Sequence, residues 1–335
     1  MEPAGFAQLH ERFNTRGILL VILEIGFQDN NKYFQKWRVD MIKVSRGHKI
    51  YKMSKDNPPV AVVDNGAVIE FSVYDAFQNQ ITSEEQSINE LNWDTMNPAT
   101  GPVYVNDAKV GDILMVSIKS IEVDPEGVMA VIPNAGLLGD KITDSEIKMI
   151  PIDGGYAHFN DDIRIPINPM IGVIGVAPPG EPIPTGTPDS HGGNMDNKLI
   201  TAGTTIYFPV FVDGALLSMG DLHAVMGDGE IIVTGVEVSG KIVVQVEVLK
   251  GHSISNPIHE TDTHYYTIGS AVDLLDAVKI ATEDMHKIVM KQLNMSFNEA
   301  GMLLSLVGDT EIAQVVDPLL TARFGVSKEY LPRIF

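Results

Sequence analysis

Short apolar runs separated by turn residues fill most of this chain, and they constrain its fold more than any other feature. Such runs recur at residues 60–63, 67–71, 113–118, 207–212, 215–219, 233–238 and 241–248. Their lengths suit β-strands, and the Gly, Asn and Asp residues between them suit tight turns. We therefore predict a β-dominated α+β fold, in which antiparallel hairpins form a sandwich-like or barrel-like core.

Three pairs of these runs predict individual hairpins. Their turns would lie at Asp64-Asn65-Gly66, at Asp213-Gly214 and at Ser239-Gly240. These are residue types that adopt the backbone angles of tight turns at low cost. The strands that flank each turn are then expected to pair with one another.

Helical periodicity is confined to the C-terminal part of the chain. Residues 271–293 carry apolar side chains at helical spacing, and residues 297–307 repeat the pattern over a shorter length. A third helix is predicted at residues 311–316, where Pro318 would end it. We expect the helices to lie near the C-terminus, after the strands.

Charge and composition exclude several classes of protein. The chain has 24 basic and 44 acidic residues, a net charge of −20, so it should repel phosphate backbones and bind no nucleic acid. The longest apolar run, residues 17–23, is too short to span a bilayer, and we expect no membrane partner and a cytoplasmic location. With no Cys, the chain has no disulfide, Cys nucleophile or thiolate metal site.

The first 40 residues differ from the rest. They carry five basic and five acidic residues, so the whole net charge lies in residues 41–335, and a second methionine, Met41, opens the first fluent β pattern. We predict that residues 1–40 are an N-terminal extension, either non-native or disordered, and that residues 41–335 form the functional domain. The alternative is an ordinary N-terminal segment.

The richest candidate site lies in residues 190–237, where His, Asp and Glu occur among glycines. Asp221 and His223 are separated by one residue, so an extended backbone would point both the same way. An Asp and a His so placed suit Zn²⁺ or a similar cation, and Glu230 or Glu237 could complete the ligand set. Glu237 stands between two valines, and this alternation predicts that it faces solvent or a cleft. The alternative is that these residues are loop caps or solvated side chains.

A second candidate is the run His191-Gly192-Gly193-Asn194. Consecutive glycines can present backbone N–H groups to a developing oxyanion, and Asn194 can donate a further hydrogen bond. The alternative is a glycine turn with an Asn cap. Asp196, two residues further on, is a candidate base or metal ligand, or a cap of the same turn.

A rival cluster has a similar composition and lies between the last predicted strands and the first helix. Ser, Asn, Pro and Thr surround it, which is typical of a loop with solvated charges, so we rank it below the glycine-rich region. Its members are His252, His259, Glu260, Asp262 and His264.

Several catalytic motifs do not occur in this sequence. It contains no phosphate-binding loop, no dinucleotide-binding glycine pattern, no Gly-x-Ser-x-Gly elbow and no His-Glu-x-x-His helix. What remains is hydrolysis assisted by a metal or by carboxylates.

In these and several other short motifs, the sequence resembles the acetamidase/formamidase family of amide hydrolases. The resemblance spans roughly residues 41–317 in order and does not cover residues 1–40. It implies a β-rich α+β fold, hydrolysis of a short aliphatic amide to carboxylate and ammonia, and a bound divalent metal. The residues that carry it are Asp75, Asn97 to Pro102, Gly111-Asp112, Gly192 to Asp196, Gly214 to Leu216, Gly220 to Ala224, Gly227 to Glu230, Glu237, Glu299-Ala300 and Gly308-Asp309.

Together, the residues and the resemblance lead to a complete functional hypothesis. The protein is predicted to be a metal-dependent amidase acting on formamide or acetamide, with zinc ahead of calcium, assembled as a homodimer or homotrimer. The alternative is a non-catalytic β protein that binds a small ligand or a cation at a structural metal site. The predicted roles are catalytic for Asp196, Glu237 and His191, oxyanion-binding for Gly192, Gly193 and Asn194, and metal-ligating for Asp75, Asp221, His223 and Glu230.

Overall fold

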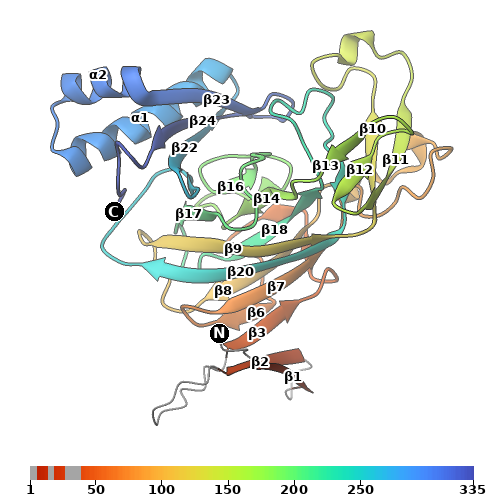
Figure 1. Ribbon diagram of the computed structural model, residues 1–335, viewed down its shortest axis with the longest axis horizontal. Helices are drawn as coiled ribbons and strands as arrows, with labels where there is room; N and C mark the ends of the chain where they lie inside the picture. The colour runs from red at the N-terminus through yellow and green to blue at the C-terminus, as the bar shows by residue number, and fades with distance from the viewer. Residues whose placement is uncertain (1–5, 14–18, 27–38) are drawn as a thin grey trace, which may run out of the picture.

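The computed structural model describes residues 6–13, 19–26 and 39–335, and two large sheets dominate it (Figure 1). In order of pairing, the first sheet consists of β1 (Phe6–Phe13), β2 (Leu19–Gly26), β3 (Val39–Val44), β7 (Val68–Val73), β20 (Gly240–Leu249), β9 (Ile113–Val123), β17 (Thr205–Pro209), β21 (Ile258–Glu260), β22 (His264–Ala271), β24 (Leu320–Ser327) and β23 (Gly308–Gln314).

The second sheet carries the candidate site. Its order is β13 (Arg164–Pro166), β12 (Tyr156–His158), β11 (Glu146–Asp153), β10 (Glu126–Val131), β19 (Glu237–Val238), β18 (Leu217–His223), β14 (Met170–Gly175) and β16 (Gly192–Asn194). Strand β8 (Ala99–Val105) also pairs with β18 and joins β4 (Lys49–Ile50) and β6 (Ala61–Val63) to this sheet. A small separate sheet pairs β15 (Ile183–Pro184) with β5 (Lys52–Met53).

Alternating side chains from both sheets fill one common core. In β7 the buried positions are Ile69, Phe71 and Val73, and in the neighbouring β20 they include Ile242 and Val244. Residues of β8, β14 and β18 from the second sheet belong to the same buried cluster. Because successive side chains of a strand point to opposite faces, each sheet buries one row here. The predicted β-dominated α+β fold with a sandwich-like core is confirmed.

The three predicted hairpins are wrong in their pairing, and all for one reason. At each predicted turn the chain leaves one sheet and enters the other, so the flanking strands do not pair. Strand β6 lies in the second sheet and β7 in the first, and the same change of sheet separates β17 from β18 and β19 from β20. Turn residues show where a chain changes direction, whereas the pairing partner is set by burial against distant strands.

Two α-helices lie within the described part of the chain, and both were predicted. Helix α1 (Leu274–Leu293) begins after Asp273, whose carboxylate accepts from the backbone N–H of Leu275 at 2.9 Å, and ends at Asn294 in the left-handed conformation. Helix α2 (Phe297–Val307) begins with a capping box formed by Ser296 and Glu299. Both lie beside β22–β24, at the side of the molecule away from β10–β13 (Figure 1).

The buried face of α1 differs from the predicted one. Val272 and Leu275 were counted among its apolar positions but are largely exposed. The helix instead packs small and flexible residues against β22 and β24, because β22 approaches it closely: the Thr267 hydroxyl donates to the carbonyl of Ala281 at 2.6 Å. The buried row consists of Ala277, Ala281, Met285 and Val289.

The third predicted helix, residues 311–316, is wrong. Residues Gly308–Gln314 form strand β23, which pairs antiparallel with β24 at the edge of the first sheet. The segment is short, so pairing with a complete neighbouring strand outweighs its local helix preference. Shorter 3₁₀ turns occur at η1 (Ile88–Glu90), η2 (Trp93–Thr95) and η3 (Gly139–Lys141).

The predicted extension at residues 1–40 falls largely on residues outside the described ranges. The parts described are β1, β2 and the start of β3; β2 pairs with β3, and β3 pairs in parallel with β7. The division of the chain at residue 41 stays a prediction.

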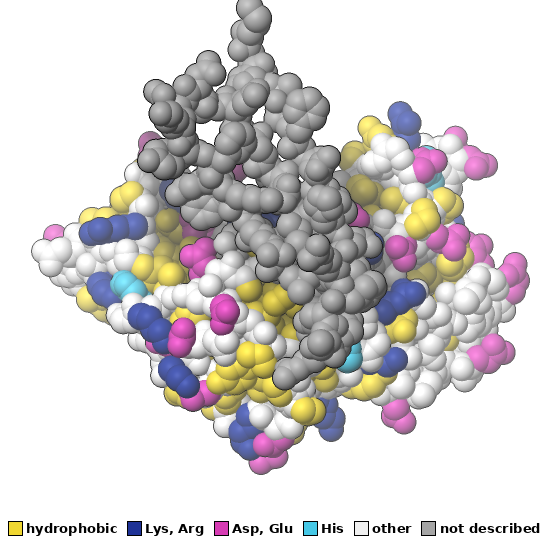
Figure 2. Space-filling view, turned by 90° about the horizontal axis from the view of Figure 1, so that it is seen from below, with side chains coloured by type: hydrophobic (Ala, Val, Ile, Leu, Met, Phe, Trp, Pro, Cys, Tyr) yellow, Lys and Arg dark blue, Asp and Glu magenta, His cyan; other side chains and the backbone are white. Residues whose placement is uncertain are grey.

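One face of the molecule illustrates how the charges are arranged. Figure 2 shows Lys and Arg side chains interspersed with Asp and Glu around hydrophobic patches, so the excess of acidic residues does not form a single-sign surface on this face. Within the described residues, no helix combines the length and the apolar content needed to cross a bilayer.

Candidate metal centre

Strand β18 is the platform of the site. All its residues are buried, and it pairs with β14, β19 and β8, so it lies inside the second sheet. Asp221 and His223 are two residues apart in this strand, which agrees with the predicted same-side arrangement. Asp221 has a positive φ of 54°, uncommon for a residue with a side chain. Both residues belong to the strand, and His223 is its last residue.

The remaining acids of the site come from three other segments. Glu237 opens β19 and lies directly opposite His223 in the antiparallel register. Asp196 follows β16 and Glu230 lies in the turn before β19, and both have positive φ, 40° and 47°. Such angles are rarely adopted by residues with side chains and often mark functional positions.

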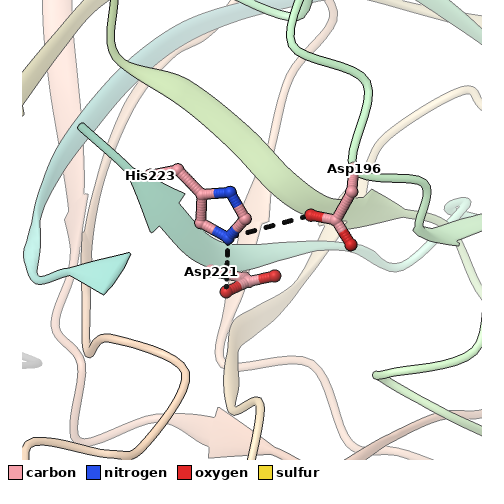
Figure 3. Close-up of side chains that lie close together, drawn as sticks. All are labelled: Asp196, Asp221 and His223. Atoms are coloured by element: carbon pink, nitrogen blue, oxygen red, sulfur yellow. Dashed lines mark ion pairs between the residues drawn. The ribbon is translucent and has the colours of Figure 1, made fainter. Parts of the chain in front are cut away.

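These side chains converge on the His223 imidazole. Its Nε2 lies 3.1 Å from Glu237 Oε2, 3.4 Å from Asp221 Oδ1, 3.8 Å from Asp196 Oδ1 and 3.9 Å from Glu230 Oε1. Figure 3 shows Asp196 and Asp221 pointing toward this nitrogen from different segments. Two sets of three ligand atoms, Asp196–Asp221–His223 and His223–Glu230–Glu237, are close enough to share a cation, with His223 common to both.

Two glycines make room for this convergence. A Cβ atom on Gly172 in β14 would lie 2.4 Å from Asp196 Oδ1 and 2.5 Å from Asp221 Oδ2. A Cβ atom on Gly235 would lie 2.6 Å from His223 Nδ1. Any side chain at either position would displace the site residues, so the absence of a Cβ is a structural requirement here.

The site is deeply buried and rich in acceptors that lack donors. Asp196, Asp221, His223 and Glu237 are each at most 2% exposed. Among the residues that the structure describes, both carboxylate oxygens of Asp196, Asp221 Oδ1 and Glu237 Oε2 accept no hydrogen bond. Burying carboxylates costs several kcal/mol per ion unless they are paired or bind a metal. One imidazole with several carboxylates is a donor set that fits a divalent cation.

The same burial perturbs the ionisation of these groups. Burial, reinforced by the charge of Asp221, raises the pKa of Asp196 to about 7. Burial also raises the pKa of Glu237 to about 8, against the opposing effect of His223. Burial alone would lower the pKa of His223, but Glu237 and Asp221 outweigh it and raise that pKa well above its usual value.

A sixth group, Asp317, belongs to the site and was missed by the sequence analysis. Its Oδ2 accepts a hydrogen bond of 2.9 Å from Asn194 Nδ2, and burial together with the charge of Asp196 raises its pKa well above the usual value. Asp317 lies just after β23, about 80 residues beyond Glu237 in the chain. The one local signal is its place directly before Pro318, and this signal specifies backbone conformation but no ligand.

Arg323 of β24 holds two of the site-bearing loops together. It is 1% exposed, and its Nη1 donates to Asn197 Oδ1 at 2.8 Å, next to Asp196 in the chain. Its guanidinium also makes a bidentate pair with Asp228 at 3.1 and 2.8 Å, and Asp228 lies two residues before Glu230. Nε donates to Glu311 at 2.6 Å. The C-terminal hairpin thereby fixes the loops of both site acids.

Comparison with known proteins shows to which family this chain belongs. A model of the Acetamidase/Formamidase family matches residues 42–185 and 180–318. The chain belongs to the acetamidase/formamidase family. The resemblance found from the sequence is therefore confirmed.

The individual relatives agree with this membership. The chain is 26% identical over 262 residues to an acetamidase of Mycolicibacterium smegmatis, an alignment covering 58% of this chain and 64% of that protein. It is 38% identical over 109 residues to a formamidase of Methylophilus methylotrophus, covering 30% and 27% of the two chains. The aligned part thus spans less than two thirds of the length of these curated relatives.

Solved structures match more completely. The crystal structure of an acetamidase from Bacillus halodurans superimposes with a TM-score of 0.86 at 45% identity, covering 88% of this chain and 99% of that one. An acetamidase from Yersinia enterocolitica gives a TM-score of 0.83 at 31% identity, covering 88% and 93%. The fold described above is therefore that of this family.

Two predicted site residues, Asp75 and His191, lie outside the ligand sets. Asp75 is buried, and its Oδ1 accepts from the backbone N–H of Asn79 at 2.7 Å; burial raises its pKa to about 6. Neither Asp75 nor His191 belongs to the two ligand sets found among the described residues. His191 is fully buried beside Gly193, and burial lowers its pKa to about 4.

The two glycines of the predicted oxyanion site form a tight turn. The Gly192 N–H donates to the carbonyl of Asp189 at 2.9 Å, so it is engaged within its own turn. Gly192 and Gly193 have positive φ of 96° and 82°, as expected for a tight glycine turn. Asn194 is 5% exposed and directs its amide toward Asp317, next to the acid cluster.

The prediction that Glu237 faces solvent or a cleft is wrong, since this residue is 2% exposed. Its alternation with two valines predicts that it lies on the opposite face from them, but its carboxylate lies in the buried cluster, 3.1 Å from His223 Nε2. A local pattern gives the side of a strand on which a residue lies, but not what covers that side.

The rival cluster does not converge. His259 is fully buried and stacks on Tyr266, with ring centroids 6.1 Å apart. Glu260 pairs with Lys328 at 2.7 Å, and His264 Nδ1 lies 2.8 Å from Thr263 Oγ1. Among the residues searched, His252, His259, Glu260, Asp262 and His264 form no ligand set. Ranking this cluster below the glycine-rich region agrees with the geometry.

Proposed function

We propose that this protein is a metal-dependent amidase that hydrolyses short aliphatic amides, formamide and acetamide among them, to carboxylate and ammonia. Membership of the acetamidase/formamidase family and the names of its relatives support amide hydrolysis. The observation that carries metal dependence is the set of buried carboxylate oxygens without donors around His223 Nε2. Buried clusters of carboxylates are stabilised by a bound cation, because burying their charge without a partner is costly.

The cation would be held by His223 together with either Asp196 and Asp221 or Glu230 and Glu237, and Asp75 lies outside both sets. Such a cation, when bound, activates water and polarises an amide carbonyl. The imidazole together with carboxylates favours zinc, while the excess of oxygen ligands keeps calcium as the second candidate.

The chain's own groups supply the remaining chemistry. Asn194 and Gly193 orient the carbonyl oxygen of the amide, and Gly192 shapes the turn that carries them. Amide nitrogen leaves poorly unless it is protonated, so whichever of Asp196 and Glu237 is free of the cation delivers that proton, with His191 as the next candidate. The β18–β14 surface around Gly172 keeps these groups away from bulk water.

The experiment measures ammonia release from acetamide and formamide by the purified protein, alongside its metal content. Chelation should abolish turnover, and adding back zinc or calcium separately should identify the metal that restores it. Thermal unfolding of the chelated protein supplies the discriminating control. If chelation lowers the melting temperature and no amide is hydrolysed under any metal, the protein is instead a cation-binding β protein with a structural site. Assembly as a dimer or trimer and a cytoplasmic location remain predictions.

A further inference from the structure

A cavity of about 580 Å³ adjoins the metal centre. Strands β10 to β13 contribute one part of its wall, and residues 225–236, which include Glu230, contribute the other. In Figure 1 these strands form the group at the upper right. The wall is mainly apolar and includes Met129, Ile150, Phe159, Ile165, Met226 and Ile231.

The cavity and the metal centre share two residues. Glu230 lines the cavity, and its Oε1 lies 3.9 Å from His223 Nε2. Gly235 also lines the cavity, and a Cβ atom on it would lie 2.6 Å from His223 Nδ1. The cavity therefore reaches a candidate metal ligand at Glu230 and comes within one residue of the imidazole at Gly235.

The polar groups of the cavity belong to this shared side. Asp228 is held by Arg323 and Lys198, and the Thr234 hydroxyl donates to the carbonyl of Ala130 at 3.2 Å. Glu230 is thus the polar lining group that belongs to the metal centre. A mainly apolar cavity of 300–1,000 Å³ with a few polar groups at one end is the usual form of a small-molecule site.

The size of the cavity exceeds what the smallest amides need. At about 30 Å³ for each water-sized group, the four heavy atoms of acetamide fill roughly 120 Å³, and the eight of hexanamide fill roughly 240 Å³. Phe159, Ile165 and Ile231 at its rim are partly exposed, so a ligand can reach it from solvent.

We propose that this cavity binds the acyl group of the substrate, and that the preferred substrates are primary amides with an uncharged apolar acyl group of about six carbons. The inference rests on the proposed amidase function. In the reaction, a water oxygen bonds to the carbonyl carbon, the C–N bond breaks, and the nitrogen leaves with two added protons as ammonium. An amide with an acidic acyl group, such as succinamate, is excluded because burying its carboxylate in an apolar wall beside Glu230 is unfavourable.

The first test compares kcat/KM of the metal-loaded protein for hexanamide, acetamide and succinamate. We expect hexanamide to exceed acetamide by about tenfold or more, since a well-fitted pocket discriminates by this factor or more for added methylenes. Succinamate should be the poorest of the three. If acetamide is hydrolysed and hexanamide is no better, the cavity proposal falls while the proposed function stands. If no amide is hydrolysed, both fall.

A filling variant tests the place of binding. Gly227 lines the cavity, its φ is not positive, and no atom lies within 4 Å of a Cβ built on it, so Gly227→Leu should fold without strain. We expect it to lower the hexanamide-to-acetamide ratio of kcat/KM about tenfold. Gly180→Leu is the matched control, because Gly180 has the same open surroundings outside the cavity, and both rates should stay unchanged. An unaltered ratio in Gly227→Leu overturns the proposal.

A polar variant tests the chemistry of the wall. Ile231 and Ile163 are both 49% exposed, but only Ile231 lines the cavity. Ile231→Ser should weaken hexanamide binding, measured by calorimetry as a loss of affinity and of the negative heat-capacity change, while Ile163→Ser should not. Light scattering on both variants measures the oligomeric state and so shows whether a second copy of the chain occupies this surface. If Ile231→Ser dissociates an oligomer and leaves hexanamide binding intact, a second copy of the chain covers this surface and the proposal is wrong.

Discussion

Two regions of this protein are both rich in metal-ligating side chains, but they have very different structures. Residues 190–237 and residues 252–264 each gather His, Asp and Glu, yet only the first brings them to a common point. In the first, register places Glu237 opposite His223, and positive φ angles turn Asp196 and Glu230 inward. In the second, Glu260 pairs with Lys328 and His264 contacts Thr263, so these side chains do not converge. Metal-like composition therefore needs convergent backbone geometry before it becomes a site.

The largest difference between the two regions should appear when one histidine is removed from each. His223→Ala removes the atom common to both ligand sets, so we expect at least about a hundredfold loss of metal affinity and no measurable turnover. His264→Ala, in the non-convergent region, should keep both. Metal analysis and ammonia release check the pair, with circular dichroism to show that each variant is folded. Full activity of metal-free His223→Ala protein would rule out metal dependence.

A methyl group added beside the acids should have the next largest effect. Gly172→Ala places a Cβ about where Asp196 Oδ1 and Asp221 Oδ2 now lie, at 2.4 and 2.5 Å, and must push them apart. We expect metal affinity to fall about 10- to 100-fold, as for the loss of a group that orients ligands. Gly180→Ala, which meets no atom within 4 Å, is the control. Equal affinity in both variants would mean that the two carboxylates do not bind the cation in this arrangement.

The ion pairs of the two regions should also differ in how much they contribute to the free energy of unfolding. Arg323→Met leaves Glu311 without this partner and Asp228 with Lys198 alone. Because both carboxylates are 32% exposed, we expect a loss of roughly 1–3 kcal/mol in the free energy of unfolding together with weaker metal binding. Lys328→Met breaks the pair with Glu260 in the other region, where partial exposure limits the loss to about 1 kcal/mol or less. Denaturant unfolding and zinc titration measure both. Unchanged metal affinity in folded Arg323→Met would confine Arg323 to stability alone.

The last expected effect concerns the pH dependence of stability. Burial lowers the pKa of His259 to about 3, below the usual value near 6.5, so the unfolded chain binds its proton first as pH falls. This residue therefore makes stability rise with pH between about 3 and 6.5, and it adds nothing to the slope above that window. His259→Phe should flatten the curve there by up to about 1.4 kcal/mol per pH unit. Parallel curves for both proteins would show that His259 is solvated.

The sequence predicted the parts of the site that depend on local spacing. Asp221 and His223 lie on one side of a strand because side chains alternate, and the same rule identified the face of Glu237. What covers that face depends on register with β18, which no local pattern contains. The three turns were located correctly, but the burial of both sheets decided that each turn joins the two sheets instead of forming a hairpin.

Asp317 and Arg323 could not be found in the same way. Both come from the β23–β24 region, where residues 311–316 were predicted to be helical, and a helix would have directed their neighbours elsewhere. Pairing at the edge of the sheet outweighed the local preference there. A site assembled from distant segments becomes predictable only once the strand order is known.

The contribution of the last hairpin also sets the order in which the protein can be completed during synthesis. Arg323 leaves the ribosome more than 80 residues after Glu237. Chains are synthesised at about 5–20 residues per second, so Arg323 follows the acids of β18 and its neighbouring turns by roughly 4–17 seconds. Only then can its guanidinium join Asn197 to Asp228. During that interval water must solvate these acids. The candidate metal centre is thus one of the last parts of the nascent chain to close.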